Sequence, residues 1–178
     1  MLRAIYAGSF DCYTNGHHDI VKRASNMFDE LHILIAVNSD KYRTFPAEDM
    51  YCLIRSALEQ DEIENCIVKL YDGLVAEYAE QNRICYLIRG LRNTMDYQYE
   101  ENIASINRLI CPKLETIYFR TNNAAISSSM VRDMIKYGKD TSEFVPGVVH
   151  EYLKAIPQSR RIAIWPSERE KLFSAQSV

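Results

Sequence analysis

Two short segments of this chain combine the residue types that hold phosphate groups. The first, residues 8–18, reads GSFDCYTNGHH and follows a largely apolar run at residues 2–7. Glycines let a backbone approach an anion closely, and a helix beginning near Gly16 would point unpaired N–H groups and its positive dipole end at the same place. His17 would lie in the first turn, where its imidazole can donate to a phosphoryl oxygen. We expect a phosphate site here, with His18 as a solvated or packing residue.

The second segment, residues 126–132, reads ISSSMVR. Three serines at a strand-to-helix junction offer hydroxyl and backbone donors to an anion. Ser127 or Ser128 can equally serve as the N-cap of the following helix, and serine clusters before helices are common caps. Taken alone, this segment is more typical of a cap than of a ligand site.

The elements that must position these segments alternate along the chain. Apolar runs predict strands at residues 2–7, 31–37, 67–71, 84–88 and 114–119, and amphipathic stretches predict helices at 16–28, after Pro46, near 74–79, at 94–110 and at 128–137. Parallel neighbours require crossover connections, so this order predicts an α/β fold with a doubly wound, mostly parallel, five-stranded sheet and helices on both faces. Ligands bind such sheets beyond the carboxyl ends of the strands, where the strand order reverses.

Arg89 directly follows the fourth apolar run, so we expect it at the carboxyl end of a strand, where ligand groups are favoured. Lys41 lies in a polar stretch and Glu100 lies beside another glutamate, so the sequence alone favours surface charges at both positions. The helix at 94–110 ends before Pro112. Its expected packing positions are Tyr97, Ile103, Ile106, Leu109 and Ile110.

Composition limits the class of protein. The chain has 178 residues, of which 47% are hydrophobic, and this predicts one domain with a full core at residues 1–157, followed by an appended tail at 158–178. A formal charge of -3 argues against nucleic acid as a partner. No segment approaches the roughly 18 to 20 uncharged residues that cross a bilayer, so we expect no membrane association and a cytoplasmic location.

The five cysteines form no C-x-x-C pair, and five is an odd number. Neither a disulfide framework nor a zinc site is indicated, and a reducing compartment fits best. We expect each cysteine to be a small buried or half-buried apolar residue.

The two phosphate-type segments, in this order within one domain, resemble the nucleotidyltransferases that carry a T/H-x-G-H signature and a later ISSS/T-x-x-R signature. Within the first segment the likeness is carried by Thr14-Asn15-Gly16-His17, and two further stretches extend it: residues 87–92 (LIRGLR) and residues 96–100 (DYQYE). With them, residues 1–156 resemble the bacterial phosphopantetheine adenylyltransferases. The resemblance implies a Rossmann-like nucleotidyltransferase fold and transfer of AMP from ATP to 4′-phosphopantetheine.

The resemblance also implies roles for individual residues. The catalytic residues it implies are His17, Lys41 and Arg89. The residues it implies for the acceptor are Ser9, Lys41, Leu74, Val75 and Arg89. Those it implies for ATP are Ser9, Phe10, His17, Gly90, Leu91, Arg92, Glu100, Asn123, Ala124, Ala125, Ile126, Ser127, Ser128 and Ser129. It further implies a homohexamer. Triphosphate chemistry itself implies Mg²⁺ that enters with ATP and needs no metal site on the protein.

The chain departs from the usual family pattern within the first segment. Cys12 and Tyr13 stand where the family usually has proline followed by a residue such as isoleucine or valine, and loss of the fixed proline φ would loosen the loop. Ser9 replaces a more common threonine and keeps the hydroxyl. Residues 123–125 (NAA) replace an aromatic-containing stretch, so packing near the nucleotide would differ.

Two other functions fit the same signatures. The triphosphate motif is shared with enzymes that transfer AMP to nicotinamide mononucleotide or CMP to a polyol phosphate, so the acceptor residues must decide between them. A nucleotide-binding module without catalysis is the alternative from another class. Such a module would be expected to lack the imidazole or the basic acceptor groups, and this chain keeps them.

Overall fold

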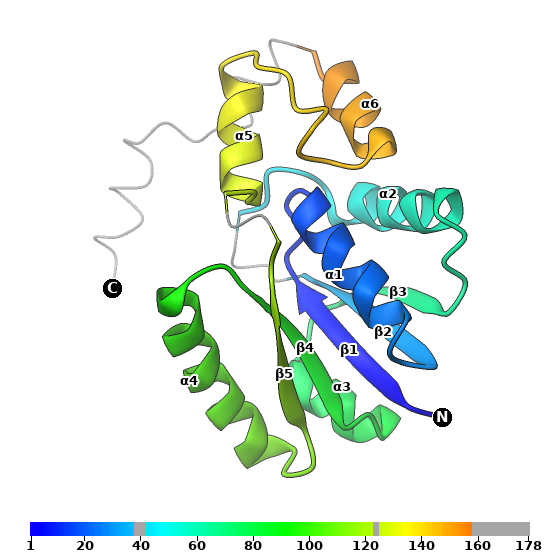
Figure 1. The fold of residues 1–178 in the computed structure, drawn as a ribbon, viewed down its shortest axis with the longest axis vertical. Coiled ribbons are helices and arrows are strands. Elements are labelled where there is room, and N and C mark those ends of the chain that lie inside the picture. The colour runs from blue at the N-terminus through cyan, green and yellow to red at the C-terminus, as the bar shows by residue number, and fades with distance from the viewer. Residues whose placement is uncertain (38–41, 123–124, 158–178) are drawn as a thin grey trace.

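A computed structural model describes residues 1–37, 42–122 and 125–157. Its centre is one sheet of five strands in the order β3-β2-β1-β4-β5, with every neighbouring pair parallel (Figure 1). The strands are β1 (Arg3–Gly8), β2 (Glu30–Ala36), β3 (Cys66–Tyr71), β4 (Tyr86–Leu91) and β5 (Glu115–Arg120). The strand order reverses between β1 and β4, so the doubly wound parallel sheet expected from the sequence is confirmed.

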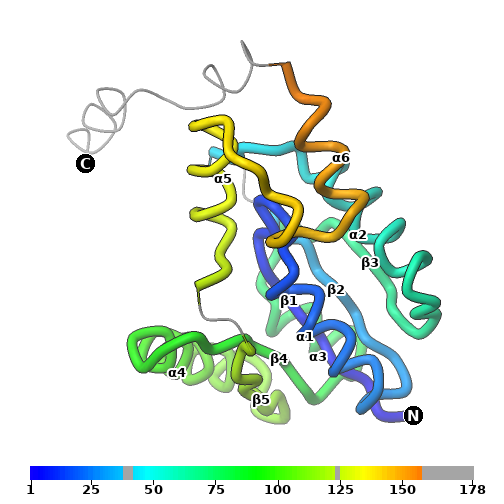
Figure 2. Tube along the Cα trace, turned by 45° about the horizontal axis from the view of Figure 1, so that its top comes forward, coloured from blue at the N-terminus to red at the C-terminus, as the bar shows by residue number. Residues whose placement is uncertain are grey.

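Within the described ranges six helices pack on the faces of the sheet or beyond its carboxyl edge: α1 (Asn15–Ser25), α2 (Ala47–Gln60), α3 (Val75–Asn82), α4 (Thr94–Ile110), α5 (Ser128–Lys136) and α6 (Gly147–Ala155). Buried side chains of α1, α2, α5 and α6 share one apolar cluster with one face of the sheet, and those of α3 pack on the other face with the residues that follow α4. Figures 1 and 2 both set α5 and α6 beyond the carboxyl ends of the strands. The two helices therefore lie over the edge of the sheet at which ligands bind in such folds.

The bounds of the fourth strand differ from the expected ones, and one helix was not anticipated. The strand expected at 84–88 is observed at Tyr86–Leu91, so Arg89 and Gly90 pair with β5 inside the sheet instead of following the strand. The α6 helix has no counterpart among the expected elements. It begins after Pro146 without a side-chain cap, so the polar start signal that marks many helices is missing there.

The outer face of α4 carries residues that were expected to pack against the rest of the protein. The exposed fractions of Tyr97, Ile106 and Leu109 are 44%, 57% and 84%, whereas Ile103 and Ile110 are half-buried. The buried residue of this helix is Glu100. The helical period was correct, but three of the five expected packing positions lie on the exposed side of the helix.

The cysteines are all free, and their burial is mixed. Cys12 and Cys111 are buried and Cys66 is half-buried, as expected, but Cys52 and Cys85 are exposed. Burial raises the pKa of Cys12 to about 12, so this side chain is an uncharged thiol that packs inside the core.

Gly90 has a packing role that can be tested. A Cβ atom at this position would lie 2.5 Å from Cδ1 of Ile20, which is 2% exposed and has little room to move. We expect Gly90→Ala to lower the free energy of unfolding by about 1 to 3 kcal/mol, measured by urea denaturation. Ile20→Val removes the clashing methyl, so the double variant is expected to be more stable than Gly90→Ala alone. Parental stability of Gly90→Ala would refute this account.

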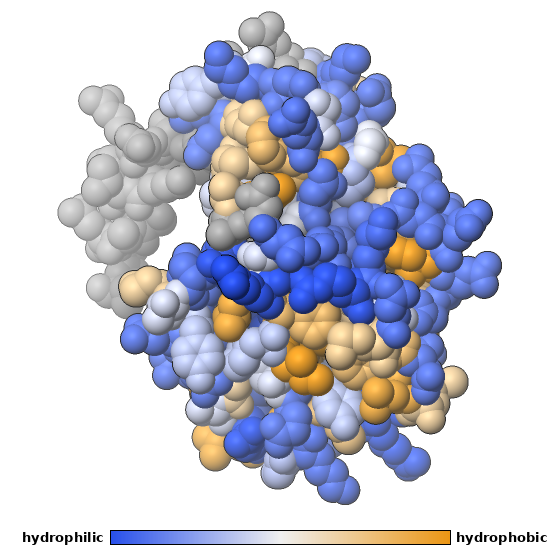
Figure 3. Space-filling view, viewed as in Figure 1, coloured by the Kyte–Doolittle hydropathy of each residue, from blue (hydrophilic) through white to orange (hydrophobic). Residues whose placement is uncertain are grey.

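The molecular surface in the view of Figure 3 carries a band of hydrophilic side chains across its middle, below α5, with apolar side chains gathered beneath the band. Within the described ranges, no helix has the length and apolar character needed to span a bilayer.

Candidate active site

A cleft of about 390 Å³ opens at the carboxyl ends of β1 and β4, where the strand order reverses. It is lined by the end of β1, the first turn of α1, the end of β4 and the first turn of α5. Both phosphate-type segments therefore reach the same cleft. The first N–H groups of an α-helix have no partner inside the helix, so the starts of α1 and α5 provide two sets of donors here.

His17 is held in place by the start of its own helix. Thr14 is the N-cap, and its hydroxyl accepts from the backbone N–H of His17, while its own backbone N–H donates to Nδ1 of His17 at 3.1 Å. This reciprocal capping box explains why the helix begins as early as Asn15. Because Nδ1 accepts a hydrogen bond, the ring proton lies on Nε2, and the neutral imidazole is a donor.

The charge state of His17 follows from its surroundings. Desolvation lowers the pKa of His17 to about 4, and the positive charges of Arg92 and Arg89 add to the effect. The imidazole is therefore neutral at pH 7. A neutral ring with its proton on Nε2 can donate a hydrogen bond to a phosphoryl oxygen without first taking up a proton.

This charge state predicts a pH dependence. We expect ¹⁵N NMR spectra of the His17 ring to show the neutral Nε2–H tautomer at pH 7 and still at pH 5, because the pKa of about 4 lies below both. The unfolded chain binds this proton near the ordinary histidine pKa of about 6.5. His17 therefore reduces the free energy of unfolding as the pH falls from about 6.5 toward 4. A protonated ring at pH 6 would contradict the assignment.

The Phe10 side chain packs against the His17 ring. Its own ring is 1% exposed, lies edge-on to His17 at a centroid distance of 5.1 Å, and also contacts Tyr6 and Tyr13 edge-on. The φ angle of Phe10 is 46°, in the left-handed region that bulky residues rarely adopt. The aromatic packing holds this conformation, so Phe10 presents its backbone to the cleft and packs its ring against His17.

Hydrogen bonds join the two phosphate-type segments. The Ser128 hydroxyl donates to the carbonyl of Cys12 at 2.7 Å, and the Arg132 guanidinium donates to the carbonyl of Asp11. The Asp11 carboxylate in turn accepts from the backbone N–H groups of Thr44 and Phe45. Cys12 is fully buried, so tertiary contacts fix the loop whose loosening was expected from the missing proline.

Arg89 and Glu100 form a close ion pair at the floor of the cleft. The Arg89 Nε and Nη2 atoms donate to the two Glu100 carboxylate oxygens at 2.7 and 2.6 Å, and Nη1 donates to the carbonyl of Ala7 at 2.6 Å. Burial alone would lower the pKa of Arg89, but the pairing with Glu100 raises it. These bonds use three of the five N–H groups of a guanidinium, so two remain for a ligand.

Most of the residues expected at the site meet in this cleft. Those that line it are Ser9, Phe10, His17, Arg89, Gly90, Arg92, Glu100, Ile126, Ser127, Ser128 and Ser129. Lys41, Asn123 and Ala124 lie outside the described residues. Four expected residues are not among those lining the cleft: Leu91, whose carbonyl pairs with Thr121, the exposed Ala125, and Leu74 and Val75 at the start of α3.

The cleft also contains residues for which the sequence predicted no role at the site. They are Tyr6, Ala7, Gly8, Thr14, Gly16, Ile20, Thr121 and Arg132. Three of them could have been predicted from the sequence, because Thr14, Gly16 and Arg132 belong to the two signatures themselves. Tyr6 and Thr121 carried no such signal, because only the pairing of strands brings the ends of β1 and β5 to one edge.

The described residues offer no cage for a metal ion, since no group of three or more His, Cys, Asp or Glu side chains is arranged to hold one. Glu100, the carboxylate that lines the cleft, already pairs with Arg89.

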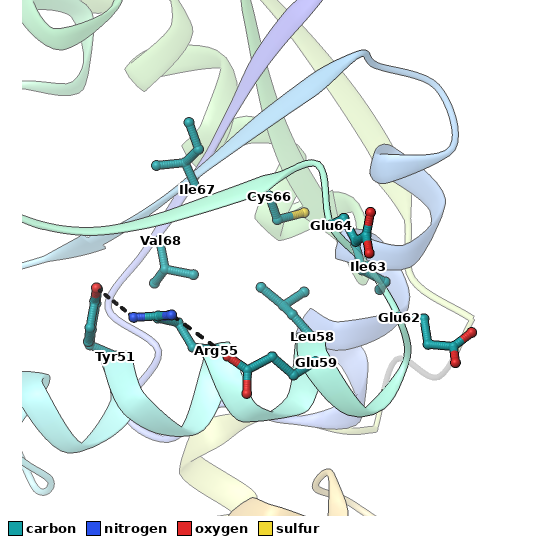
Figure 4. Close-up of a pocket in the computed structure, with 10 residues that line it drawn as sticks. All are labelled: Tyr51, Arg55, Leu58, Glu59, Glu62, Ile63, Glu64, Cys66, Ile67 and Val68. Atoms are coloured by element: carbon teal, nitrogen blue, oxygen red, sulfur yellow. Dashed lines mark hydrogen bonds and ion pairs between the residues drawn. The ribbon is translucent and has the colours of Figure 1, made fainter.

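A larger cavity of about 860 Å³ lies between α2 and β3 (Figure 4). Arg55 reaches between Tyr51 and Glu59 there, and the remaining lining residues are mostly apolar or acidic. This cavity lies beside the amino end of β3, opposite the edge where parallel sheets bind ligands. We therefore assign the candidate active site to the cleft that contains His17.

The fold of the chain is similar to that of solved nucleotidyltransferases. A putative nicotinate-nucleotide adenylyltransferase from Vibrio parahaemolyticus aligns with a TM-score of 0.64 and 17% identity, covering 86% of this chain and 93% of that one. A bifunctional NMN adenylyltransferase/ADP ribose pyrophosphatase from Francisella tularensis aligns with a TM-score of 0.73 and 12% identity, covering 97% of this chain and 54% of that one. At these identities the likeness concerns the fold alone.

Sequence relatives are closer. The cytidylyltransferase-like family matches residues 5–134. The phosphopantetheine adenylyltransferase of Shouchella clausii is 39% identical over 158 residues, which cover 88% of this chain and 98% of the relative. That of Cytophaga hutchinsonii is 43% identical over 145 residues, covering 80% and 95%. Given these matches over most of its length, the chain belongs to the phosphopantetheine adenylyltransferases of the cytidylyltransferase-like family.

Proposed function

We propose that this chain transfers an adenylyl group from ATP to 4′-phosphopantetheine, forming dephospho-coenzyme A and pyrophosphate. The names of the two relatives support this activity. The observation that carries it in the structure is the neutral imidazole of His17, which lies beside two arginines in a cleft built from both phosphate-type segments.

The proposed reaction is a direct displacement. An oxygen of the pantetheine phosphate attacks the α-phosphorus of ATP, the bond from that phosphorus to the bridging oxygen of the β-phosphate breaks, and pyrophosphate leaves with the bond electrons. Both substrates are polyanions, so alignment and charge neutralisation can supply the catalysis without a covalent enzyme intermediate. In this scheme Nε2–H of His17 donates to an α-phosphate oxygen, where charge builds in the transition state.

The two substrates would occupy opposite sides of His17. We propose that Ser9, Lys41 and Arg89 hold the acceptor phosphate, with the arm of pantetheine running toward Leu74 and Val75. We propose that Gly90, Leu91, Arg92, Glu100 and residues 123–129 surround the nucleotide. A phosphate on a long uncharged arm suits basic groups followed by apolar ones, whereas a mononucleotide acceptor would favour a side chain that stacks on its ring.

Magnesium would accompany ATP on its phosphate oxygens. The solved enzyme from Francisella tularensis, which is described as complexed with AMP and a Mn ion, supports the use of a divalent ion in this fold. The ion would neutralise phosphate charge, and the residues of this chain would bind and orient the phosphates around it.

The test is a comparison of acceptors. The purified protein is incubated with ATP and Mg²⁺ and either 4′-phosphopantetheine or nicotinamide mononucleotide, and in a third arm with CTP and a polyol phosphate, and pyrophosphate is measured. We expect release with 4′-phosphopantetheine only. Turnover with another acceptor and none with 4′-phosphopantetheine would overturn the proposal, and ATP binding by calorimetry without product in any arm would favour a binding module.

We further propose that residues 1–157 form the nucleotidyltransferase domain, that the enzyme acts in the cytoplasm and that it assembles as a homohexamer. Sedimentation equilibrium of the purified protein tests the assembly, with six times the 20.7 kDa chain mass expected.

A further inference from the structure

Tyr13 is the side chain that faces the flat side of the His17 ring. The two rings are stacked, with a centroid distance of 5.8 Å and an interplanar angle of 16°. Tyr13 is fully buried, so its ring has no freedom to swing into solvent. Together with Phe10 at the ring edge and Thr14 at Nδ1, Tyr13 completes the set of contacts that orient the imidazole.

The hydroxyl of Tyr13 is tied to the surface through two further residues. It lies 3.0 Å from Nδ1 of His18, and Nε2 of His18 lies 2.9 Å from the Asp61 carboxylate. Asp61 is the C-cap residue of α2 and also accepts from Lys22 at 2.7 Å. His18 is thus a half-buried bridge between Tyr13 and the end of α2, and its ring also packs edge-on against Tyr13 at a centroid distance of 5.7 Å, in keeping with the packing role expected as one of two from the sequence.

The direction of these hydrogen bonds follows from the charges. Hydrogen bonds from Lys22 and His18 lower the pKa of Asp61, so it is an ionised acceptor. Burial raises the pKa of Tyr13 well above its ordinary value, so the phenol keeps its proton. Nε2–H of His18 therefore donates to Asp61, and the Tyr13 hydroxyl forms a hydrogen bond with Nδ1.

We propose that Tyr13 is a positioning residue for His17, and that His18 and Asp61 act through it by fixing the tilt of the Tyr13 ring. The proposal rests on the proposed function, because the imidazole must meet the α-phosphate at the right angle and a small misplacement of a catalytic group lowers the rate steeply. It concerns residues that depart from the usual family pattern, since Tyr13 stands where an aliphatic residue is common.

Steady-state kinetics of single variants test the role of the ring. Tyr13→Leu removes the stacked ring, and we expect kcat to fall about tenfold while KM for ATP stays within twofold of the parent. Tyr13→Phe keeps the ring, so it is expected to retain most of the activity that Tyr13→Leu loses. Both are measured well below the midpoint of thermal unfolding. Parental kcat in Tyr13→Leu would overturn the proposal, as would equal losses in the two variants.

A double-mutant cycle tests whether His18 acts through the Tyr13 hydroxyl. We expect His18→Leu to lower kcat in the parent by the same small factor as Tyr13→Phe, and to cause no further loss in the Tyr13→Phe background, where the hydrogen bond is already gone. Additive losses would refute the chain of contacts. Lys22→Ala is the matched control, because it removes the other partner of Asp61 without touching either imidazole, and it is expected to keep parental kcat.

A third measurement does not need the reaction, so it separates this inference from the proposed function. In ¹⁵N spectra of the protein alone, the His17 ring is expected to give one tautomer in the parent and in Tyr13→Phe. Tyr13→Leu is expected to give exchange-broadened or mixed-tautomer signals. Unchanged His17 signals in Tyr13→Leu would overturn the inference, whatever acceptor the enzyme uses.

Discussion

Replacing His17 with alanine is expected to lower kcat by roughly 30- to 1,000-fold, the equivalent of about 2 to 4 kcal/mol of transition-state stabilisation. The reason is that Nε2–H is a preorganised donor, held by the capping box with Thr14 and by the stacked Tyr13 ring. The donor acts where charge develops, so the transition state loses more than the ground state does. Measured as pyrophosphate release, kcat should fall far more than ATP affinity.

Two variants serve as controls for this result. His150→Ala also removes a histidine, but from α6, where the ring contacts Thr141 away from the cleft, and its kcat is expected to be parental. His17→Asn keeps an N–H donor at the same position, so it is expected to retain more activity than His17→Ala. A His17→Ala enzyme within a few-fold of the parent would show that the imidazole has no role in the transition state.

Glu100→Ala is expected to reduce stability by about 3 kcal/mol. The change leaves the Arg89 guanidinium, whose side chain is 23% exposed, without its two carboxylate acceptors. Losing one partner of a buried ion pair costs more than the pair itself contributes, because the remaining charge is poorly solvated. For a chain of this size the melting temperature should fall by about 6 to 12 °C, measured by thermal unfolding.

A surface pair in the same protein provides the matched control. Arg108 and Glu115 also form an ion pair between an arginine and a glutamate, through a hydrogen bond of 2.8 Å, but their side chains are 61% and 60% exposed. Glu115→Ala is therefore expected to change stability by less than about 1 kcal/mol. If Glu100→Ala and Glu115→Ala lowered the melting temperature equally, burial would not be the reason for the importance of the Arg89–Glu100 pair.

The pairing of Arg89 with Glu100 also changes the interpretation of both residues. From the sequence, one was an expected catalytic arginine and the other an expected nucleotide contact, with no link between them. In the structure two N–H groups of Arg89 donate to Glu100, and both carboxylate oxygens of Glu100 accept from them. Glu100 therefore limits the directions from which Arg89 can contact a phosphate. We expect Glu100 to affect activity mainly through Arg89.

The sequence by itself determined the order along the chain of the five strands and the first five helices, and the two phosphate-type segments. Both are local signals: a period of two or 3.6 residues, and glycine, serine and histidine at fixed spacing near a helix start. The bounds of α4 agree with the expected 94–110, and α1 begins where a Thr-x-Gly-His segment can form a capping box. Such features need only neighbours along the chain, so they can be predicted without a structure.

The tertiary structure alone decided which distant groups meet. The bond from Ser128 to Cys12 spans 116 residues, and the chain from Tyr13 through His18 to Asp61 joins α1 to the end of α2. The exposed side of α4 likewise depends on how the helix settles on the sheet. These contacts depend on the packing angles of whole elements, and periodicity along the sequence carries no information about those angles.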